Sequence, residues 1–514
     1  MVPNTVSPAA GIRSSWTTRS MFKLPTTAMR LCIWAILPRV RDDGAALGVD
    51  LGTGSVKVAV VSPDGKVQAK ASRSYSLSSP HPGWAEADPR EWLSATQEAV
   101  AELGDAITGA ASVGCSGQMH GLVLCDEHLE PVRPAITWAD TRAGAEAAQM
   151  QAELGEGVLA RLGSPAVSGF AATSLRWVSG HEPAALKEAA HALQPKDWLR
   201  ARLGGEVVTE PSDASGTLLA DVATGTWDER AVSWTGIDAR LLPQIVDSRS
   251  ATGVIGLAGR ELPSVAGAAD TAAAIVGFGL GVDDGFTAVG SGSQSVSVVS
   301  EPGGGIALGT HLFATAGAPG SGWYRIGAVQ NAGIALRKAL QWLGATPDQA
   351  NAALEGGVRA SDPIFVPYVA GERTPFVDAS LRGAWLGLGL DTDRQAMLRS
   401  VIEGVAHAVA LGMQAVSDAG AHLPEPLPLI GGGTVDPRFR QLIADISGRA
   451  LLPMEEPDAA VIGAALLAMP GHVVGSMAGF SGQVVEPSSA KTEILTERRG
   501  RLVEYVTSRG SNPR

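Results

Sequence analysis

The chain has 514 residues and a mass of 52.7 kDa, which is too long for one hydrophobic core, so we expect at least two domains. Hydrophobic residues make up 45% and charged residues 18%, a composition that excludes disorder over the whole chain. The net charge of −12 comes without any sign of a basic face, which argues against a nucleic-acid partner. The longest apolar stretch near the N-terminus, residues 31–38, is too short to span a bilayer, so we expect no membrane partner.

The three cysteines, Cys32, Cys115 and Cys125, are sparse, odd in number and without metal-ligand spacing. This usage argues against a disulfide framework or a zinc site, and it is typical of free thiols in a reducing compartment. Together with the acidic surface, it favours a cytoplasmic enzyme.

The N-terminal segment differs in composition from the rest of the chain. Residues 1–41 contain no Asp or Glu and carry six Lys or Arg residues among many Ser and Thr. A transit-type presequence is one interpretation. We favour a disordered or artefactual extension over residues 1–44, with translation starting at Met21, Met29 or later as a further alternative, and exclude it from the fold.

A β-meander is predicted directly after this segment. Residues 46–51 form a buried apolar run that ends in Asp50-Leu51, and residues 56–62 and 66–72 follow as strands separated by turns. The first turn, Gly52-Thr53-Gly54-Ser55, has Gly where the backbone bends tightly or approaches a ligand.

The same design returns in the second half. Residues 287–289 and 296–299 are predicted strands around a second Gly/Ser-rich turn over 290–295. Exposed amides in such turns form anion-binding nests suited to phosphate. Two such units predict two related domains that face each other across a cleft, over residues 45–279 and 280–514.

Helices and strands alternate between the two turns, which indicates an α/β fold. Ligands in such folds lie at the carboxyl ends of strands, and Asp50 and the segment Gln118-Met119-His120 both fall there. The predicted elements are helices 89–103 (with Asp88 as N-cap), 140–154 and 196–203, and strands 111–116 and 122–125.

Asp270 follows a strand or loop and begins a small-residue helix over 270–274. It could serve only as a helix N-cap, since Asp is favoured there. The other interpretation is a carboxylate in the cleft that acts as a base, and the two roles are compatible.

Three consecutive glycines, Gly431, Gly432 and Gly433, stand with Thr434 between a predicted strand over 428–430 and a helix over 437–446. Such a run exceeds what packing alone needs, and it lets a flat ligand or a phosphate lie against bare backbone near a helix N-terminus. A flexible loop is the alternative.

Several stretches resemble the FGGY carbohydrate kinases of the actin-like ATPase superfamily, in family order and over nearly the whole chain after the N-terminal segment. The loop Gln118-Met119-His120-Gly121 is similar to the D-xylulose kinase version. The other stretches are residues 48–57, 82–89, 116–121, 138–142, 195–199, 212–217, 267–270, 371–375 and 430–433.

The resemblance implies two actin-like (RNase-H-like) domains with ATP and Mg²⁺ between them, and transfer of the γ-phosphate to a ketopentose hydroxyl. D-Xylulose is the expected substrate and D-xylulose 5-phosphate the product. Asp270 would be the general base, Asp50 would hold Mg²⁺, and Met119, His120 and Thr271 would contact the sugar. The ATP-binding residues would be Thr53, Gly54, Ser55, Gly290, Ser291, Gly292, Gly431, Gly432, Gly433 and Thr434.

Three departures from the family pattern bear on specificity. Thr271 replaces an Asn that usually follows the catalytic Asp, so the exact ketose is open. The second turn reads Gly290-Ser291-Gly292-Ser293 instead of Gly-Thr-Ser-Gly, with Ser291 keeping a hydroxyl. Ala139 stands where Asn or Gln is common.

A kinase for another ketose or polyol, such as ribulose, is the main alternative, because few side chains set that choice. A non-catalytic sugar sensor would be expected to lose Asp50 or Asp270, and an actin-like filament or chaperone ATPase would lack the 118–121 loop. A homodimer is left open.

Overall fold

The computed structural model describes residues 44–303, 306, 308–454, 458–471, 482–488 and 492–509. Cys32 and the predicted extension, apart from residue 44, lie outside these residues. Cys115 and Cys125 are buried free thiols, as predicted. Residues 41–514 belong to one unit of the chain.

The predicted meander opens the first sheet, whose strand order is β13-β14-β5-β1-β2-β3 with β15 beside β5. β1 and β2 are antiparallel, whereas β5 runs parallel to β1 and sets Asp50 opposite Ser116. The carboxyl ends of β1 and β5 therefore lie side by side, so Asp50 and the segment after β5 are at the same edge of the sheet. The strands are β1 (Ala45–Leu51), β2 (Ser55–Val61), β3 (Val67–Ser74), β5 (Ala110–Gly117), β13 (Ala251–Leu257), β14 (Arg260–Val265) and β15 (Ala268–Ala269).

The second sheet repeats this layout, with the order β18-β19-β17-β16-β22-β23. β16 and β17 are antiparallel neighbours, and β22 runs parallel to β16 as β5 does to β1. The turn is shorter than the predicted 290–295, because Ser293 already pairs with Val289 and Val329. The strands are β16 (Gly285–Val289), β17 (Ser293–Val299), β18 (Thr310–Ala314), β19 (Trp323–Val329), β22 (Leu427–Ile430) and β23 (Leu451–Pro453).

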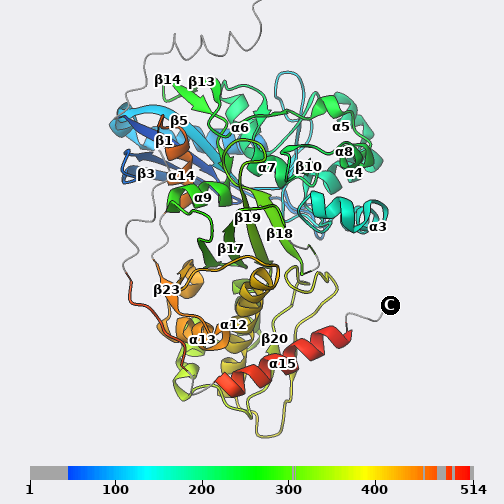
Figure 1. Cartoon of the computed structure of the whole chain (residues 1–514), viewed down its shortest axis with the longest axis vertical. Coiled ribbons are helices and arrows are strands. Elements are labelled where there is room, and N and C mark those ends of the chain that lie inside the picture. Colours follow the sequence, from blue (N-terminus) through cyan, green and yellow to red (C-terminus); the bar gives the residue numbers. More distant parts are fainter. Residues whose placement is uncertain are drawn as a thin grey trace, which may run out of the picture. The chain divides into compact units, whose positions relative to one another are not determined.

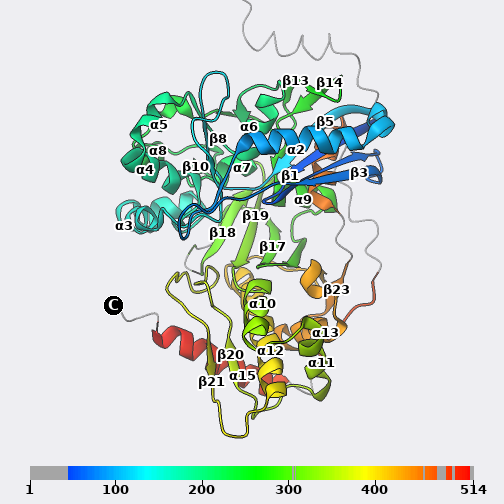
Figure 2. The same cartoon turned by 180° about the vertical axis from the view of Figure 1, so that it is seen from behind.

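Helices cover both faces of the first sheet. Helix α2 (Pro89–Glu102) lies on the face turned to the viewer in Figure 2, and α14 (Ala459–Leu467) lies against the opposite face in Figure 1. Although α14 comes late in the chain, it packs closely on this sheet and on α9 (Asp270–Phe278). A Cβ at Gly48 would come within 2.0 Å of the Val461 carbonyl oxygen, and one at Gly463 within 1.8 Å of the Ala273 oxygen. Glycine is therefore required at both contacts.

Several helices begin where the sequence predicts them. Asp88 caps α2 and Asp436 caps α13 (Pro437–Ser447) through their carboxylates, while α6 (Pro195–Arg202) lies where a helix was expected. The helix predicted from Asp140 begins only at α3 (Gly144–Arg161). Asp140 is buried, accepts from the Ala85 amide and pairs with Arg142, so the residues around it form a turn instead.

The remaining elements connect these layers. The other helices are α4 (Ala171–His181), α5 (Pro183–Glu188), α7 (Pro211–Ser215), α8 (Glu229–Thr235), α10 (Gly333–Trp342), α11 (Pro347–Ala353), α12 (Arg394–Asp418) and α15 (Thr492–Arg509). The short strands are β4 (Glu86–Ala87), β6 (Val123–Cys125), β7 (Ala135–Ile136), β8 (His191–Leu193), β9 (Val208–Thr209), β10 (Ala220–Asp221), β11 (Thr226–Trp227), β12 (Gln244–Ile245), β20 (Ile364–Val366) and β21 (Ala384–Leu386), and the 3-10 turns are η1 (Gly104–Gly109), η2 (Ala239–Leu241), η3 (Leu354–Gly356) and η4 (Gly432–Thr434).

Among the described residues, α12 is the one helix long and apolar enough to cross a membrane. Its apolar window is 89% buried inside the protein, and its side chains pack in the same core cluster as residues of β22 and α13. We therefore assign α12 as a core helix.

Candidate functional site

A cavity of about 260 Å³ lies between residues of the first sheet and residues of the second. It joins segments that are far apart in the sequence, because strands β17, β18 and β19 of the second sheet reach the loops that follow β1 and β5. The lining residues are Thr53, Met119, His120, Trp138, Phe170, Asp270, Thr271, Gln294, His311, Phe313, Ile326, Ala328 and Arg373.

Asp270 is the first residue of α9, and its carboxylate faces this cavity. Oδ1 accepts from the backbone amide of Thr271 at 2.6 Å and from the Thr271 hydroxyl at 3.1 Å. Ala269, not Asp270, occupies the N-cap position of the helix, so Asp270 does not act as an N-cap. No protein group in the described part of the chain hydrogen-bonds Oδ2, which leaves that oxygen available to a ligand.

His120 is held in an unusual conformation with a φ of 72°. Its ring stacks on Phe170 at 3.8 Å between centroids, and Nδ1 lies 2.6 Å from the Gly216 carbonyl oxygen. A carbonyl can only accept, so Nδ1 carries the hydrogen and Nε2 is left as an acceptor. Burial lowers the pKa of His120 to about 3, which keeps the ring neutral.

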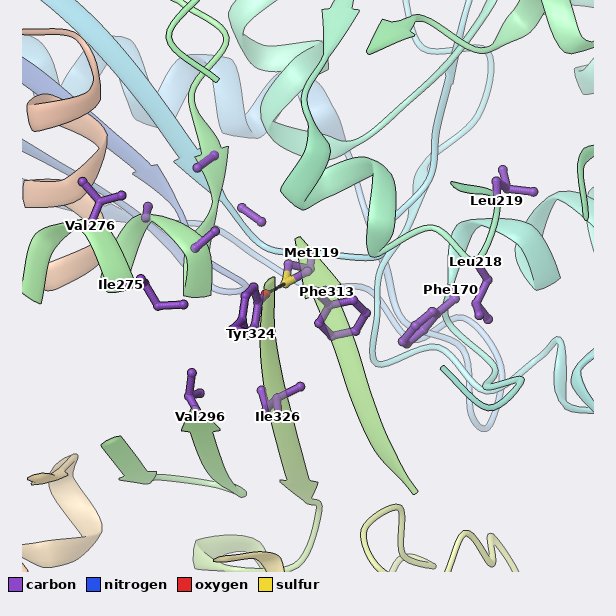
Figure 3. Close-up of a cluster of buried hydrophobic side chains, with 14 of the residues drawn as sticks. Met119, Phe170, Leu218, Leu219, Ile275, Val276, Val296, Phe313, Tyr324 and Ile326 are labelled. Atoms are coloured by element: carbon purple, nitrogen blue, oxygen red, sulfur yellow. Dashed lines mark hydrogen bonds between the residues drawn. The ribbon is translucent and has the colours of Figure 1, made fainter. Parts of the chain in front are cut away.

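Met119 lies between His120 and an apolar wall formed by the second sheet. The Tyr324 hydroxyl donates to the Met119 sulfur at 3.5 Å, and Phe313 and Ile326 lie beside this contact (Figure 3). The Met119 side chain is thereby fixed at the floor of the cavity.

Trp138 connects the first turn to the cavity wall. Its indole Nε1 donates to the Thr53 hydroxyl at 2.8 Å, while Gly52 and Ser55 close the turn through a backbone hydrogen bond of 3.0 Å. Of the three predicted residues in this turn, Thr53 lines the cavity, and Gly54 and Ser55 do not.

Asp50 is half-buried at the end of β1, and its Oδ1 atom is buried. Oδ1 has no hydrogen-bond partner in the described part of the chain. Burial, and next the charge of Asp270, raise the pKa of Asp50 to about 7. A carboxylate oxygen without a donor beside a second carboxylate fits a bound cation, and an oxygen ligand is the kind that Mg²⁺ prefers. Among the described residues, however, no three His, Cys, Asp or Glu side chains are placed so that together they could hold a metal ion.

The second turn and the glycine run lie beside each other rather than on the cavity wall. A Cβ on Gly431 would approach the Val289 carbonyl oxygen to 2.5 Å, and one on Gly433 would approach it to 2.8 Å. At two of the three positions glycine is therefore required by packing, whereas the sequence predicts a run that exceeds what packing alone needs. Val289 directly precedes Gly290, so this contact brings Gly290, Ser291 and Gly292 next to Gly431, Gly432, Gly433 and Thr434.

The structure thus brings Thr53, Met119, His120, Asp270 and Thr271 onto one cavity, and the charge of Asp270 acts on Asp50. Sequence reasoning missed the wall from the second sheet. No local motif identifies the strand residues of this wall. Arg373 lies in the stretch 371–375, which resembles the family pattern but for which the sequence alone predicts no role. The missed lining residues are Trp138, Phe170, Gln294, His311, Phe313, Ile326, Ala328 and Arg373.

A buried ionic cluster, defined as Lys196, Asp197, Arg200, Glu210 and Asp213, lies behind Asp270. Lys196 Nζ is 2.8 Å from Asp197 and 3.1 Å from Asp213, and all these side chains are inaccessible to solvent. Arg200 donates to the Ala266 carbonyl at 2.7 Å, in the loop that leads to Asp270. The cluster therefore fixes the backbone that presents the carboxylate.

Comparison with known proteins agrees with this arrangement. The chain matches the N-terminal domain of the FGGY family of carbohydrate kinases over residues 45–277 and the C-terminal domain over residues 315–471. It is 33% identical to a xylulose kinase of Escherichia coli over 423 residues, which covers 79% of this chain and 85% of that protein.

Two solved structures show the same fold. A xylulose kinase from Rhodospirillum rubrum has a TM-score of 0.79 and 26% identity, covering 90% of this chain and 98% of its own. A gluconate kinase from Lactobacillus acidophilus has a TM-score of 0.83 and 23% identity, covering 91% of this chain and 98% of its own. The fold is α/β with two actin-like domains, and the chain belongs to the FGGY family of carbohydrate kinases.

Proposed function

We propose that this carbohydrate kinase transfers the γ-phosphate of ATP to a hydroxyl of a ketopentose, D-xylulose, and releases D-xylulose 5-phosphate and ADP. The observation that carries the proposal is the free Oδ2 of Asp270, which opens on a cavity shared with Met119 and His120. Xylulose kinases among the relatives support the choice of sugar.

Asp270 would act as the general base. Burial raises the pKa of this carboxyl, so it accepts a proton more readily than a carboxylate in water. The two hydrogen bonds from Thr271 hold Oδ1. Oδ2 then takes the proton of the sugar hydroxyl, whose oxygen attacks the γ-phosphorus as the bond to the bridging oxygen of ADP breaks.

The sugar would lie between the loop after β5 and the second sheet. Nε2 of His120 accepts from a sugar hydroxyl, and Met119 and Thr271 contact the ketose from two sides. Phosphoryl transfer depends on such alignment. Because Thr271 offers a shorter side chain than Asn, the choice of sugar is tested against other ketoses and polyols.

The nucleotide would bind at the two Gly/Ser turns and the glycine run. Mg²⁺ held by Asp50 would neutralise phosphate charge during transfer. We assign the sugar and the base to the domain over residues 45–279 and the nucleotide to the domain over 280–514. The phosphate contacts would come from Thr53, Gly54, Ser55, Gly290, Ser291 and Gly292, and the adenosine contacts from Gly431, Gly432, Gly433 and Thr434.

Buried free thiols and a buried α12 support a cytoplasmic location.

The test of function is a coupled ADP-release assay with Mg-ATP and a panel of D-xylulose, D-ribulose, L-ribulose, gluconate and glycerol. We expect the highest kcat/KM with D-xylulose. A higher value with another sugar would overturn the substrate, and ATP turnover that ignores every sugar would overturn the kinase activity.

A further inference from the structure

The cavity contains one cationic side chain that the mechanism above does not use. Among its lining residues, Arg373 is the only Arg or Lys, and burial keeps both His120 and His311 neutral by lowering their pKa values. The carboxylates of Asp270 and Asp50 and an incoming triphosphate would place several negative charges in this small space. Such a site needs a compensating cation.

Among the residues that the structure describes, the guanidinium of Arg373 has no carboxylate partner. No hydrogen bond or ion pair from its side-chain nitrogens exists within the described ranges, although its five N–H groups form a rigid fork suited to carboxylate or phosphate. The neighbouring Glu372 does not pair with it. Its carboxylate instead accepts from the amides of Gln330 at 2.6 Å and Arg373 at 2.8 Å, and from the Asn331 side chain at 3.1 Å.

These contacts make the backbone around Arg373 rigid. Thr374 donates to the Ala328 carbonyl at 3.1 Å, and the Ala328 amide donates back to the Thr374 hydroxyl at 3.0 Å. The segment is thereby fixed to the end of β19. A side chain on such a frame can present a charge with little loss of entropy on binding.

Trp138 lies next to the guanidinium of Arg373 in the wall of the cavity. The Arg373 Cζ atom lies 5.9 Å from the centroid of the Trp138 ring, within the range of a cation–π contact. The same indole donates to the Thr53 hydroxyl at 2.8 Å. Arg373, Trp138 and Thr53 therefore form a chain that leads from the sugar cavity to the first Gly/Ser turn.

We propose that Arg373 binds the phosphoryl group as it moves from ATP to the sugar. The inference rests on the proposed kinase function. In the transfer, the sugar oxygen forms a bond to the γ-phosphorus, the bond from that phosphorus to the bridging oxygen breaks, ADP leaves with that oxygen, and Asp270 holds the hydroxyl proton. Arg373 donates to the equatorial phosphoryl oxygens, over which negative charge is spread during this step.

The test compares Arg373→Met, Arg373→Lys and Arg373→Ala with Arg382→Met, a matched control at an exposed arginine that bonds only backbone carbonyls. We expect Arg373→Met to lower kcat with D-xylulose by about 10²–10³, with KM for the sugar changed less than about threefold. Arg373→Lys should recover part of the rate, and added guanidinium chloride should partly restore Arg373→Ala. The control should keep wild-type kinetics.

Calorimetric binding measurements distinguish whether Arg373 contacts the phosphoryl group while it is on ATP or once it is on the sugar. Weaker binding of a non-hydrolysable ATP analogue, with ADP unchanged, would place Arg373 on the γ-phosphate. Weaker binding of D-xylulose 5-phosphate, with D-xylulose unchanged, would place it on the product. Unchanged kcat, or a raised KM for sugar at constant kcat, would overturn the inference. A wild-type protein without sugar-dependent turnover would instead overturn the proposed function.

Discussion

The Ser212 hydroxyl accepts a hydrogen bond of 2.9 Å from the backbone amide of Ala269, the residue that directly precedes Asp270. Ser212 also donates to Glu210, at 2.8 Å, within the buried ionic cluster. The position of the candidate base is therefore set by buried charges that never reach the cavity. This arrangement links the stability of the first domain to the geometry of its carboxylate.

Replacing Lys196 with Met should strongly destabilise the protein. The change removes the positive charge that Lys196 places beside the carboxylates of Asp197, Glu210 and Asp213 in the protein interior. Removing one partner from a buried ion pair costs about 3–5 kcal/mol of stability. Urea unfolding followed by circular dichroism measures the loss. Lys66→Met, at a side chain that is 82% exposed, is the control and should leave the midpoint unchanged. A loss below about 1 kcal/mol for Lys196→Met would contradict the importance of the cluster.

Gly463→Ala should destabilise the protein by about 1–3 kcal/mol or more, because the new Cβ would meet the Ala273 carbonyl oxygen of α9 at 1.8 Å. Gly180→Ala, also within a helix, meets nothing within 4 Å and should stabilise by about 0.5–1 kcal/mol. Thermal unfolding of the two variants checks the contrast. Equal melting temperatures would show that α14 and α9 can separate without loss.

The neutral His120 makes the protein less stable as the pH falls. Its folded pKa, about 3, lies below the ordinary value of 6.5, so between these values the unfolded chain binds the proton and stability decreases. From pH 7 to pH 5 the free energy of unfolding should decrease by at most about 2 kcal/mol through His120. Arg373 is the charged neighbour that opposes protonation of the ring.

The corresponding measurement is the urea unfolding free energy of wild type and His120→Gln at both pH values. The variant should lose about 2 kcal/mol less than wild type on acidification. His128→Gln removes a histidine whose side chain is 78% exposed and should retain the wild-type pH dependence. Equal pH dependence in all three proteins would mean that His120 can be protonated without unfolding.

Much of the site could be predicted because its residues stand at strand ends with recognisable turns. Asp50 lies at the carboxyl end of β1 and His120 follows β5, and these two strands pair in parallel. The opposite wall could not be predicted in this way. Phe313 and His311 are ordinary strand residues of β18, and they reach Phe170 only because the second sheet packs against the loop after α3.

The glycine run over 431–433 also shows that local sequence does not reveal contacts between distant segments. A run of three predicted a ligand surface, yet Gly431 and Gly433 also accommodate Val289 from a strand about 140 residues earlier, a contact that local sequence does not contain. Asp140 is a second case, since its pairing with Arg142 and the Ala85 amide competes with helix formation. Local propensity determines an element only where no tertiary partner competes for its polar groups.

The most direct test of the central claim is sugar-dependent ADP release by Asp270→Asn and Asp270→Ala beside wild type, with D-xylulose and Mg-ATP. The account predicts that wild type turns over only with sugar and that both variants lose at least about 10²–10⁴ in kcat, while calorimetry shows unchanged ATP binding. Sugar-dependent turnover near the wild-type rate in both variants would contradict the assignment of Asp270 as the base.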